Sequence, residues 1–190
     1  GERFASLHGA LFGLPVANGS VAIEIALRAL GIMPGDEVIV PAYTFLSTAA
    51  SVLMMGAVPV FADMDPNSYC LDPRDVALRI GPNTRAVLPV HLGGQMADMK
   101  AIEELAKIKG LVVIEDCAQA IDAALEGKKA GTWGNLGTFS FQSNKTMTAG
   151  EGGLVMTNDP DLAEMVVAMR AFGRSGGKQT ERSSAQSSKW

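Results

Sequence analysis

The chain has 190 residues, of which 47% are hydrophobic and 19% are charged, a composition typical of one globular domain with a sizeable core. Its formal net charge of −4 leaves no basic surplus, which argues against a nucleic-acid partner. The two cysteines lack metal-ligand spacing, and the sequence shows neither a secretory leader nor an apolar run of about 18 residues, the length that crosses a bilayer. We therefore expect a cytoplasmic protein without a membrane partner.

Strand-like and helix-like segments alternate along the chain. Continuous β-branched runs, typical of strands buried on both faces, lie at 37–42, 57–63, 85–91 and 111–116. Segments with apolar residues at helical spacing flank them, at 21–30, 44–55, 72–80 and 98–108. This alternation predicts the α/β class, a three-layer sandwich around a mostly parallel sheet.

Local residues predict where the helices begin and end, and how the pattern changes later. Asp72 before Pro73 and Asp98 are expected N-caps, and helix ends are expected at Gly31, Gly56, Gly81 and Gly110. The closely spaced runs 137–142 and 153–158 predict antiparallel pairing, and a last helix is expected over 159–172. We assign the methionines, including Met54, Met55, Met165 and Met169, to core packing.

Both ends of the chain are unusual. It starts GERFASLHG without an initiator methionine, and residues 176–190 form a polar, serine-rich run without helical or strand period. We expect a fragment whose ordered domain covers 1–175 and whose tail is disordered.

Polar residues that follow the predicted strands are the candidates for chemistry, because open α/β sheets bind ligands beyond the carboxyl ends of their strands. We expect five loops to converge on one edge, with the residues Asn18-Gly19-Ser20, Tyr43-Thr44-Phe45, His91, Asp116 with Gln119, and Lys145. His91 and Gln95 lie in one of these loops, yet a lone histidine is more often structural, and we also expect His8 to be structural.

Gly19 and Ser20 open a predicted helix, so their backbone N–H groups and the positive helix end could hold a phosphate. An ordinary serine N-cap is the commoner explanation of this pattern.

Asp116 ends an apolar strand and needs a cation or several donors if it is buried. Glu115 competes for the same role, but adjacent strand residues face opposite sides, so only one of the two can point into a common site. A simple turn cap is an equal alternative for Asp116.

Lys145 lies where a strand runs into the glycine-rich turn GEGG, with the hydroxyls of Ser140 and Ser143 nearby in sequence. An exposed loop lysine is the ordinary interpretation, whereas a lysine withdrawn from water becomes a nucleophilic amine that can form a Schiff base. A phosphate cradle, a buried carboxylate and such a lysine together match the needs of pyridoxal 5′-phosphate, on whose ring Phe45 or Tyr43 could stack.

Five stretches closely resemble the DegT/DnrJ/StrS family of sugar aminotransferases, which are fold-type-I pyridoxal-phosphate enzymes. They are 18–49, GAVPVFADMDPNSYCLDP (56–73), AVLPVHLGGQMADM (86–99), VVIEDCAQA (112–120) and FSFQSNKTMTAGEGG (139–153), and the likeness covers about residues 12 to 175. The resemblance implies an incomplete pyridoxal-phosphate-binding large domain of the aspartate aminotransferase-like fold over 1–175, with the C-terminal small domain absent.

By this resemblance, Lys145 matches the Schiff-base lysine and Asp116 matches the aspartate that pairs with the pyridine nitrogen. Gln119 falls near the ring oxygen of the cofactor, and Phe45 matches the residue that stacks on the ring. The implied phosphate contacts are Gly19, Ser20, Val21 and Ser140.

The resemblance also implies a reaction and an assembly. Related dehydratases carry histidine in place of Lys145, so the lysine favours transfer of an amino group from glutamate or glutamine to a keto group of a nucleotide-linked sugar or a cyclitol. Family members form homodimers in which the partner subunit donates an Asn-x-Arg stretch, and no such stretch follows Arg174. A non-catalytic, cofactor-binding regulatory relative and another fold-type-I enzyme such as a lyase remain open. A dinucleotide site is disfavoured, because G-x-G-x-x-G and P-loop motifs are missing from the sequence.

Overall fold

The computed structural model describes residues 1–171 and 173, so the tail expected at 176–190 lies outside the described residues. Seven strands form one sheet in the order β1-β9-β8-β5-β4-β2-β3. Their bounds are β1 Phe12–Val16, β2 Glu37–Pro41, β3 Val58–Ala62, β4 Thr84–Val87, β5 Val112–Asp116, β8 Leu136–Ser140 and β9 Gly153–Thr157. A two-stranded hairpin, β6 (Ala124–Leu125) with β7 (Lys128–Lys129), lies apart from it.

The sheet is mostly parallel, as predicted. The pairs β3–β2, β2–β4, β4–β5 and β5–β8 are parallel. β9 is antiparallel to both β8 and β1, which confirms the antiparallel pairing predicted for the two closely spaced runs. The carboxyl ends of β1, β5 and β8 therefore meet at the same edge of the sheet.

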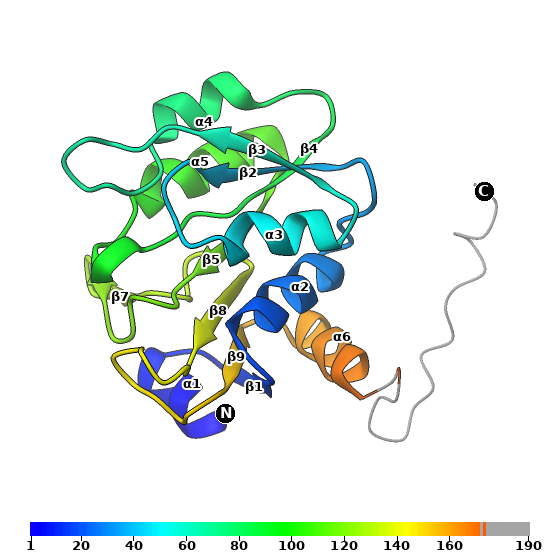
Figure 1. The fold of residues 1–190 in the computed structure, drawn as a ribbon, viewed down its shortest axis with the longest axis vertical. Helices are drawn as coiled ribbons and strands as arrows, with labels where there is room; N and C mark the ends of the chain where they lie inside the picture. Colours follow the sequence, from blue (N-terminus) through cyan, green and yellow to red (C-terminus); the bar gives the residue numbers. More distant parts are fainter. Residues whose placement is uncertain (172, 174–190) are drawn as a thin grey trace.

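Helices cover both faces of the sheet, giving three layers (Figure 1). On one face, α2 (Gly19–Ala29), α3 (Ser47–Met54) and α6 (Pro160–Arg170) share a core with the side chains of Val38, Val40, Ala86, Ile114, Leu136 and Val155. On the other, α1 (Glu2–His8), α4 (Pro73–Arg79) and α5 (Met99–Lys109) pack on residues such as Ile39, Val87, Val113 and Phe139. A short 3-10 turn, η1 (Leu92–Gly94), precedes α5.

Most of the predicted helix signals act as expected. Asp72 and Asp98 cap α4 and α5 by accepting backbone N–H groups through their side chains. Gly31, Gly56 and Gly110 adopt positive φ angles at helix ends. Gly81 was assigned this role wrongly, since α4 ends at Arg79 in an extended cap at Ile80.

Three further expectations are wrong because they depend on where an element lies. β3 forms the edge of the sheet, so Val58 and Phe61 are exposed rather than buried on both faces. The strand predicted over 85–91 ends at Val87 as β4. Beyond it, Val90 makes only an isolated bridge to Asp116.

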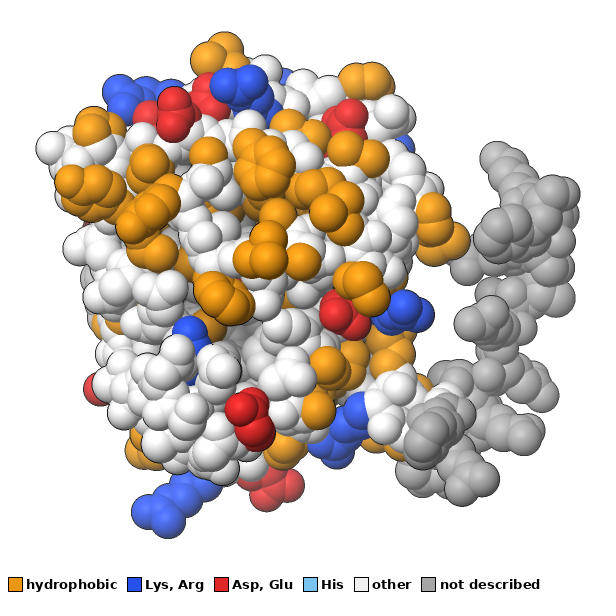
Figure 2. Space-filling model, viewed as in Figure 1, with side chains coloured by type: hydrophobic (Ala, Val, Ile, Leu, Met, Phe, Trp, Pro, Cys, Tyr) orange, Lys and Arg blue, Asp and Glu red, His pale blue; other side chains and the backbone are white. Residues whose placement is uncertain are grey.

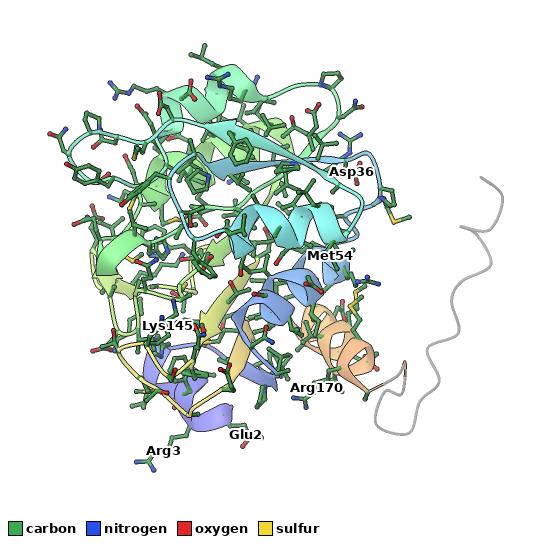
Figure 3. The ribbon with its side chains drawn as sticks, in the orientation of Figure 1. Glu2, Arg3, Asp36, Met54, Lys145 and Arg170 are labelled. Carbon is green, nitrogen blue, oxygen red and sulfur yellow. The ribbon has the colours of Figure 1, made fainter. Side chains whose placement is uncertain are left out.

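The methionines are the third case. Met55 packs against the core beside α3, but Met54, Met165 and Met169 are exposed by 72%, 43% and 37%. Figure 3 shows Met54 at the end of α3.

Within the described part of the chain, no helix combines the length and the apolar character needed to cross a membrane.

Candidate functional site

All eight residues predicted for the site line one cavity of about 470 Å³. The cavity lies at the carboxyl ends of β1, β5 and β8, where the loops after these strands meet the start of α2. The predicted residues on its wall are Gly19, Ser20, Val21, Phe45, Asp116, Gln119, Ser140 and Lys145. The structure thus brings together residues that are more than 120 positions apart in the sequence.

The first wall of the cavity is the N-terminal turn of α2, which follows β1 directly. The cap is Asn18, whose side chain accepts the N–H of Val21 at 2.9 Å, so the alternative of a serine N-cap is wrong. The first-turn N–H groups of Gly19 and Ser20 have no partner within the helix and lie at its positive end. Gly19 is also tightly packed, since a Cβ there would lie 2.8 Å from that of Ser140.

Asp116 ends β5 with only 6% of its surface exposed. Its Oδ2 accepts the Thr48 hydroxyl at 3.0 Å, and its Oδ1 accepts the N–H of Ala118 at 3.1 Å. Burial raises the pKa of Asp116, and these two hydrogen bonds, with the nearby charge of Lys145, offset part of that rise. The carboxylate keeps acceptor capacity on the side that faces the cavity.

Glu115 points to the side of the sheet opposite to Asp116. This decides which of the two adjacent carboxylates faces the cavity, a choice that the strand pattern left open. Its carboxylate accepts the N–H groups of Gly131, Trp133 and Gly134 at 2.9, 2.7 and 2.7 Å. Its fourth donor is His91, at 2.9 Å from Nε2. Glu115 therefore ties β5 to the loop before β8 and takes no part in the cavity.

His91 is a structural residue, as predicted. Its Nδ1 accepts the N–H of Ala97 at 3.2 Å, so the proton is on Nε2 and is donated to Glu115. Together with Cys117, these two residues are the one group of potential metal ligands found among the described residues. Because both ring nitrogens and the carboxylate are already hydrogen-bonded, the group is a structural network. His8 likewise stacks on Phe4 and bonds to its carbonyl.

Lys145 lies on the loop between β8 and β9, on the wall of the cavity (Figure 3). Its Nζ is 6.0 Å from the centre of the Phe45 ring. The side chain is only partly buried, so it is less withdrawn from water than the sequence suggested. Ser143, predicted to lie beside it, is exposed and does not line the cavity.

Gln119 and Tyr43 connect the cavity to a second groove of about 610 Å³. The Gln119 Oε1 accepts the N–H of Gly93, which lines that groove, at 2.9 Å. Tyr43 lines the same groove, while Phe45, two residues on, faces the cavity, so Phe45 is the aromatic residue available to a ligand there. The groove is completed by Met64, Asn67, Ser68, Tyr69, Leu92 and Gln95.

Two residues near the site were missed by the sequence analysis. Thr48 is fully buried and bonds to Asp116, and Ser47 accepts the hydroxyl of Ser20 at 2.8 Å. Both lie in the first turn of α3, where polar residues are common and carry no signal of their own. The sequence signal that could have indicated their place near the site is their position directly after the loop that carries Phe45.

The donor set matches the groups of pyridoxal phosphate, provided that the Ser20 hydroxyl, which donates to Ser47, turns toward the phosphate. Free N–H groups at a helix N-terminus and the hydroxyls of Ser20 and Ser140 suit a phosphate. At the other end of the cavity, a buried carboxylate with spare acceptor capacity suits a protonated ring nitrogen, and an amine stands between them on the wall.

Two curated relatives are 47% and 49% identical to this chain over the aligned residues. A putative L-glutamine:3-amino-2,3-dideoxy-scyllo-inosose aminotransferase from Streptoalloteichus tenebrarius is 47% identical over 91% of this chain and 42% of its own length. A protein named pleiotropic regulatory protein from Geobacillus stearothermophilus is 49% identical over 89% of this chain and 46% of its own length. The chain thus spans less than half the length of the curated relatives it matches.

Solved structures have the same fold. The crystal structure of NtdA from Bacillus subtilis, with bound cofactor PMP, superposes with a TM-score of 0.86 at 34% identity, over 94% of this chain and 41% of the other. The sequence profile of the DegT/DnrJ/EryC1/StrS aminotransferase family matches residues 1–188. With the fold, the cavity and the motifs in agreement, the chain belongs to the DegT/DnrJ/EryC1/StrS aminotransferase family.

Proposed function

We propose that this chain is the cofactor-binding part of an aminotransferase that moves an amino group from glutamate or glutamine to a keto group of a nucleotide-linked sugar or a cyclitol. The observation that carries the proposal is the placement of Lys145 and Asp116 on the wall of one cavity. The name of the Streptoalloteichus relative, an L-glutamine:inosose aminotransferase, supports both the donor and the class of acceptor.

The cofactor of this family is pyridoxal 5′-phosphate. When bound, it supplies an aldehyde for covalent attachment and a ring that withdraws electrons from the reacting carbon. We assign its phosphate to the first turn of α2 and to Ser140, its ring face to Phe45 and its ring oxygen to Gln119. These roles follow the family resemblance and agree with the positions of the side chains around the cavity.

Lys145 has two tasks in this proposal. Its amine would hold the cofactor, and in each half-reaction it would carry a proton away from the reacting carbon of the donor or onto that of the acceptor. Asp116 holds a proton on the ring nitrogen, because a buried carboxylate next to a protonated nitrogen is stabilised as the anion. Thr138, Phe139 and Val90 also line the cavity and help to exclude water.

The second groove is our candidate for the acceptor. It begins at Gln119 and Tyr43, next to the assigned ring position, and it offers two tyrosine hydroxyls, the amides of Asn67 and Gln95 and the Ser68 hydroxyl. None of the described residues on its walls carries a charged side chain. This chemistry suits a neutral, hydroxyl-rich ring such as a sugar or a cyclitol.

A partner subunit is part of the proposal. Among the described residues that line the cavity, Lys145 alone is basic, and Glu24 and Glu151 add negative charge. A doubly charged phosphate there calls for a further cation, which agrees with the Asn-x-Arg stretch that the family resemblance assigns to the partner. Figure 2 shows apolar side chains gathered on the face that carries α3, and Phe45, Leu46, Leu53 and Met54 are exposed by 61–76%. We therefore propose a homodimer for the complete protein.

A cytoplasmic location is also a proposal. It is supported by Cys70 and Cys117, which are both free and buried, as expected in a reducing compartment.

The test of the proposed function uses the complete protein. Loading with pyridoxal phosphate should give a visible absorption band, and borohydride should then fix the cofactor covalently onto the peptide that contains Lys145. Adding L-glutamine should convert the bound cofactor to its amino form. A protein that cannot be loaded, or that is labelled on another lysine, would refute the proposal.

A non-catalytic regulatory protein is the second candidate. It is favoured by the name of the Geobacillus relative, which is as similar to this chain as the aminotransferase is. A protein of this kind would be loaded on Lys145 but would not exchange its amino group with L-glutamine.

A further inference from the structure

Thr48 stands directly behind the catalytic carboxylate proposed above. It is fully buried, and its hydroxyl donates to Asp116 Oδ2 at 3.0 Å. A hydroxyl has one proton, so Thr48 cannot also donate to Thr44, whose Oγ1 lies 3.1 Å away. Thr44 must therefore donate to Thr48, and the two hydroxyls form a chain that runs from the wall of the cavity to the carboxylate.

This direction of the chain follows when Asp116 is ionised. An ionised carboxylate only accepts hydrogen bonds, whereas a protonated one must also donate. If Oδ2 carried a proton and donated it to Thr48, both hydroxyls would have to reverse, so that Thr48 donates to Thr44. The other donor, the Ala118 N–H on Oδ1, belongs to the backbone, so Thr48 is the side chain that can be changed.

We propose that Thr48 is a positioning residue that, with Thr44 behind it, orients Asp116 and holds it in the ionised form that a protonated ring nitrogen requires. Thr48 is not among the residues that line the cavity, so it acts through Asp116 and not through contact with cofactor or substrate. The inference rests on the proposed function, because the cofactor ring is what Asp116 serves.

Three substitutions separate this role from general packing. Thr48→Val keeps the shape and removes the hydroxyl, and Thr48→Ser keeps the hydroxyl. The matched control is Thr84→Val at the start of β4, because the Thr84 hydroxyl also donates to a carboxylate, that of Glu37, at 3.0 Å. Thr84 is buried as well, and it lies at the opposite end of the strands from the cavity.

The first readout needs no cofactor. Titration of the Asp116 side-chain carbon by NMR should show a higher pKa in Thr48→Val than in the unsubstituted protein, with Thr48→Ser close to the latter. Thr84→Val should leave this titration unchanged. The other ionisable groups around Asp116 are the same in all four proteins; they are its neighbours Glu115 and Cys117, His91 and Lys145, and Glu24 and Glu151 on the cavity wall. An unchanged Asp116 titration in Thr48→Val would overturn the inference.

The second readout is the dissociation constant of pyridoxal phosphate. We expect it to rise about tenfold to a hundredfold in Thr48→Val, the range for a lost hydrogen bond to a charged group. The rise should grow toward acidic pH and be largely absent in Thr48→Ser. Affinity equal to that of the unsubstituted protein would count against the inference.

Two complications can be separated in advance. If Thr48→Val does not fold, Thr44→Val removes the second hydroxyl at a partly exposed position and should raise the Asp116 pKa by a smaller amount. No change in that variant would overturn the inference. If the unsubstituted protein binds no cofactor, the proposed function fails, while the cofactor-free titration still decides the role of Thr48.

Discussion

Two consecutive carboxylates at the end of β5 have opposite environments. Glu115 is fully buried, and its carboxylate receives four hydrogen bonds, about as many as a carboxylate can accept. Asp116 is almost as buried but receives only two, and its free side faces a cavity with an amine on its wall. The difference shows that burial alone does not mark a candidate for catalysis; burial with unused acceptor capacity toward a cavity does.

The largest expected effect concerns Lys145, which shares the cavity with Asp116 and not with Glu115. Lys145→Ala should abolish the borohydride-stable link to the cofactor and lower turnover on the order of a thousandfold or more, because the attaching amine is removed. Mass spectrometry of the labelled peptide and donor-exchange kinetics measure both. Lys109→Ala, at the exposed end of α5, is the control, and a surviving link in Lys145→Ala would contradict the account.

Asp116→Asn tests the functional side of the pair. Turnover should fall roughly a hundredfold to ten-thousandfold, since the ring nitrogen loses its counter-ion. Some cofactor should remain bound through Lys145 and the start of α2. The free energy of unfolding without cofactor should not fall, because an amide is less costly to bury than a carboxylate. Steady-state kinetics and urea unfolding give both values, and unchanged turnover would disprove the assignment.

Glu115→Gln tests the structural carboxylate of the pair and, in contrast to Asp116→Asn, should lower the free energy of unfolding. The amide would direct N–H groups at backbone donors, so the free energy of unfolding should fall by about 3–5 kcal/mol, the cost of breaking a buried charged network. Urea unfolding without cofactor measures the loss. If Glu115→Gln were as stable as the unsubstituted protein, the network would not fix the end of β5.

The pH dependence of stability should distinguish Asp116 from its amide. Burial raises the folded-state pKa of Asp116 above its pKa in the unfolded chain, so the stability that it contributes is fully present below the unfolded-state pKa. This contribution is lost as the pH rises through the folded-state pKa. Without cofactor, Asp116→Asn should therefore become more stable relative to the unsubstituted protein as the pH rises from the unfolded-state pKa of Asp116 to its folded-state pKa. Urea unfolding midpoints at a series of pH values measure this gain. A constant difference across these pH values would rule out the raised pKa.

The smallest expected effect lies in the second groove. Tyr69→Phe should raise the KM for a keto-cyclitol such as 2-deoxy-scyllo-inosose about twofold to tenfold, the range for one neutral hydrogen bond. The half-reaction with L-glutamine should be unaffected, because the donor reacts at the cavity. An unchanged KM for the acceptor, with the donor step intact, would remove Tyr69 from the acceptor site.

The sequence was sufficient for the class of fold and for the content of the cavity. Continuous apolar runs and helix caps are local signals, so the parallel sheet and most helix ends could be predicted. The strand period alone could not give the side of the sheet that Asp116 faces, because it separates Asp116 from Glu115 without saying which one faces the ligand. Only the family resemblance assigned Asp116.

Long-range packing explains the remaining errors. Thr48 reaches Asp116 across 68 positions of sequence, and nothing near Thr48 indicates that partner. The exposure of Met54 and of β3 depends on which strand is at the edge of the sheet and on what covers it, and neither is written in local hydrophobicity.

The most direct test of the central claim is a crystal structure of the complete protein with pyridoxal phosphate bound. The account predicts electron density continuous from Lys145 Nζ into the ring, with the ring nitrogen within hydrogen-bond distance of the Asp116 carboxylate. A ring bound to Lys145 whose nitrogen lies far from Asp116, or a cofactor outside this cavity, would contradict it.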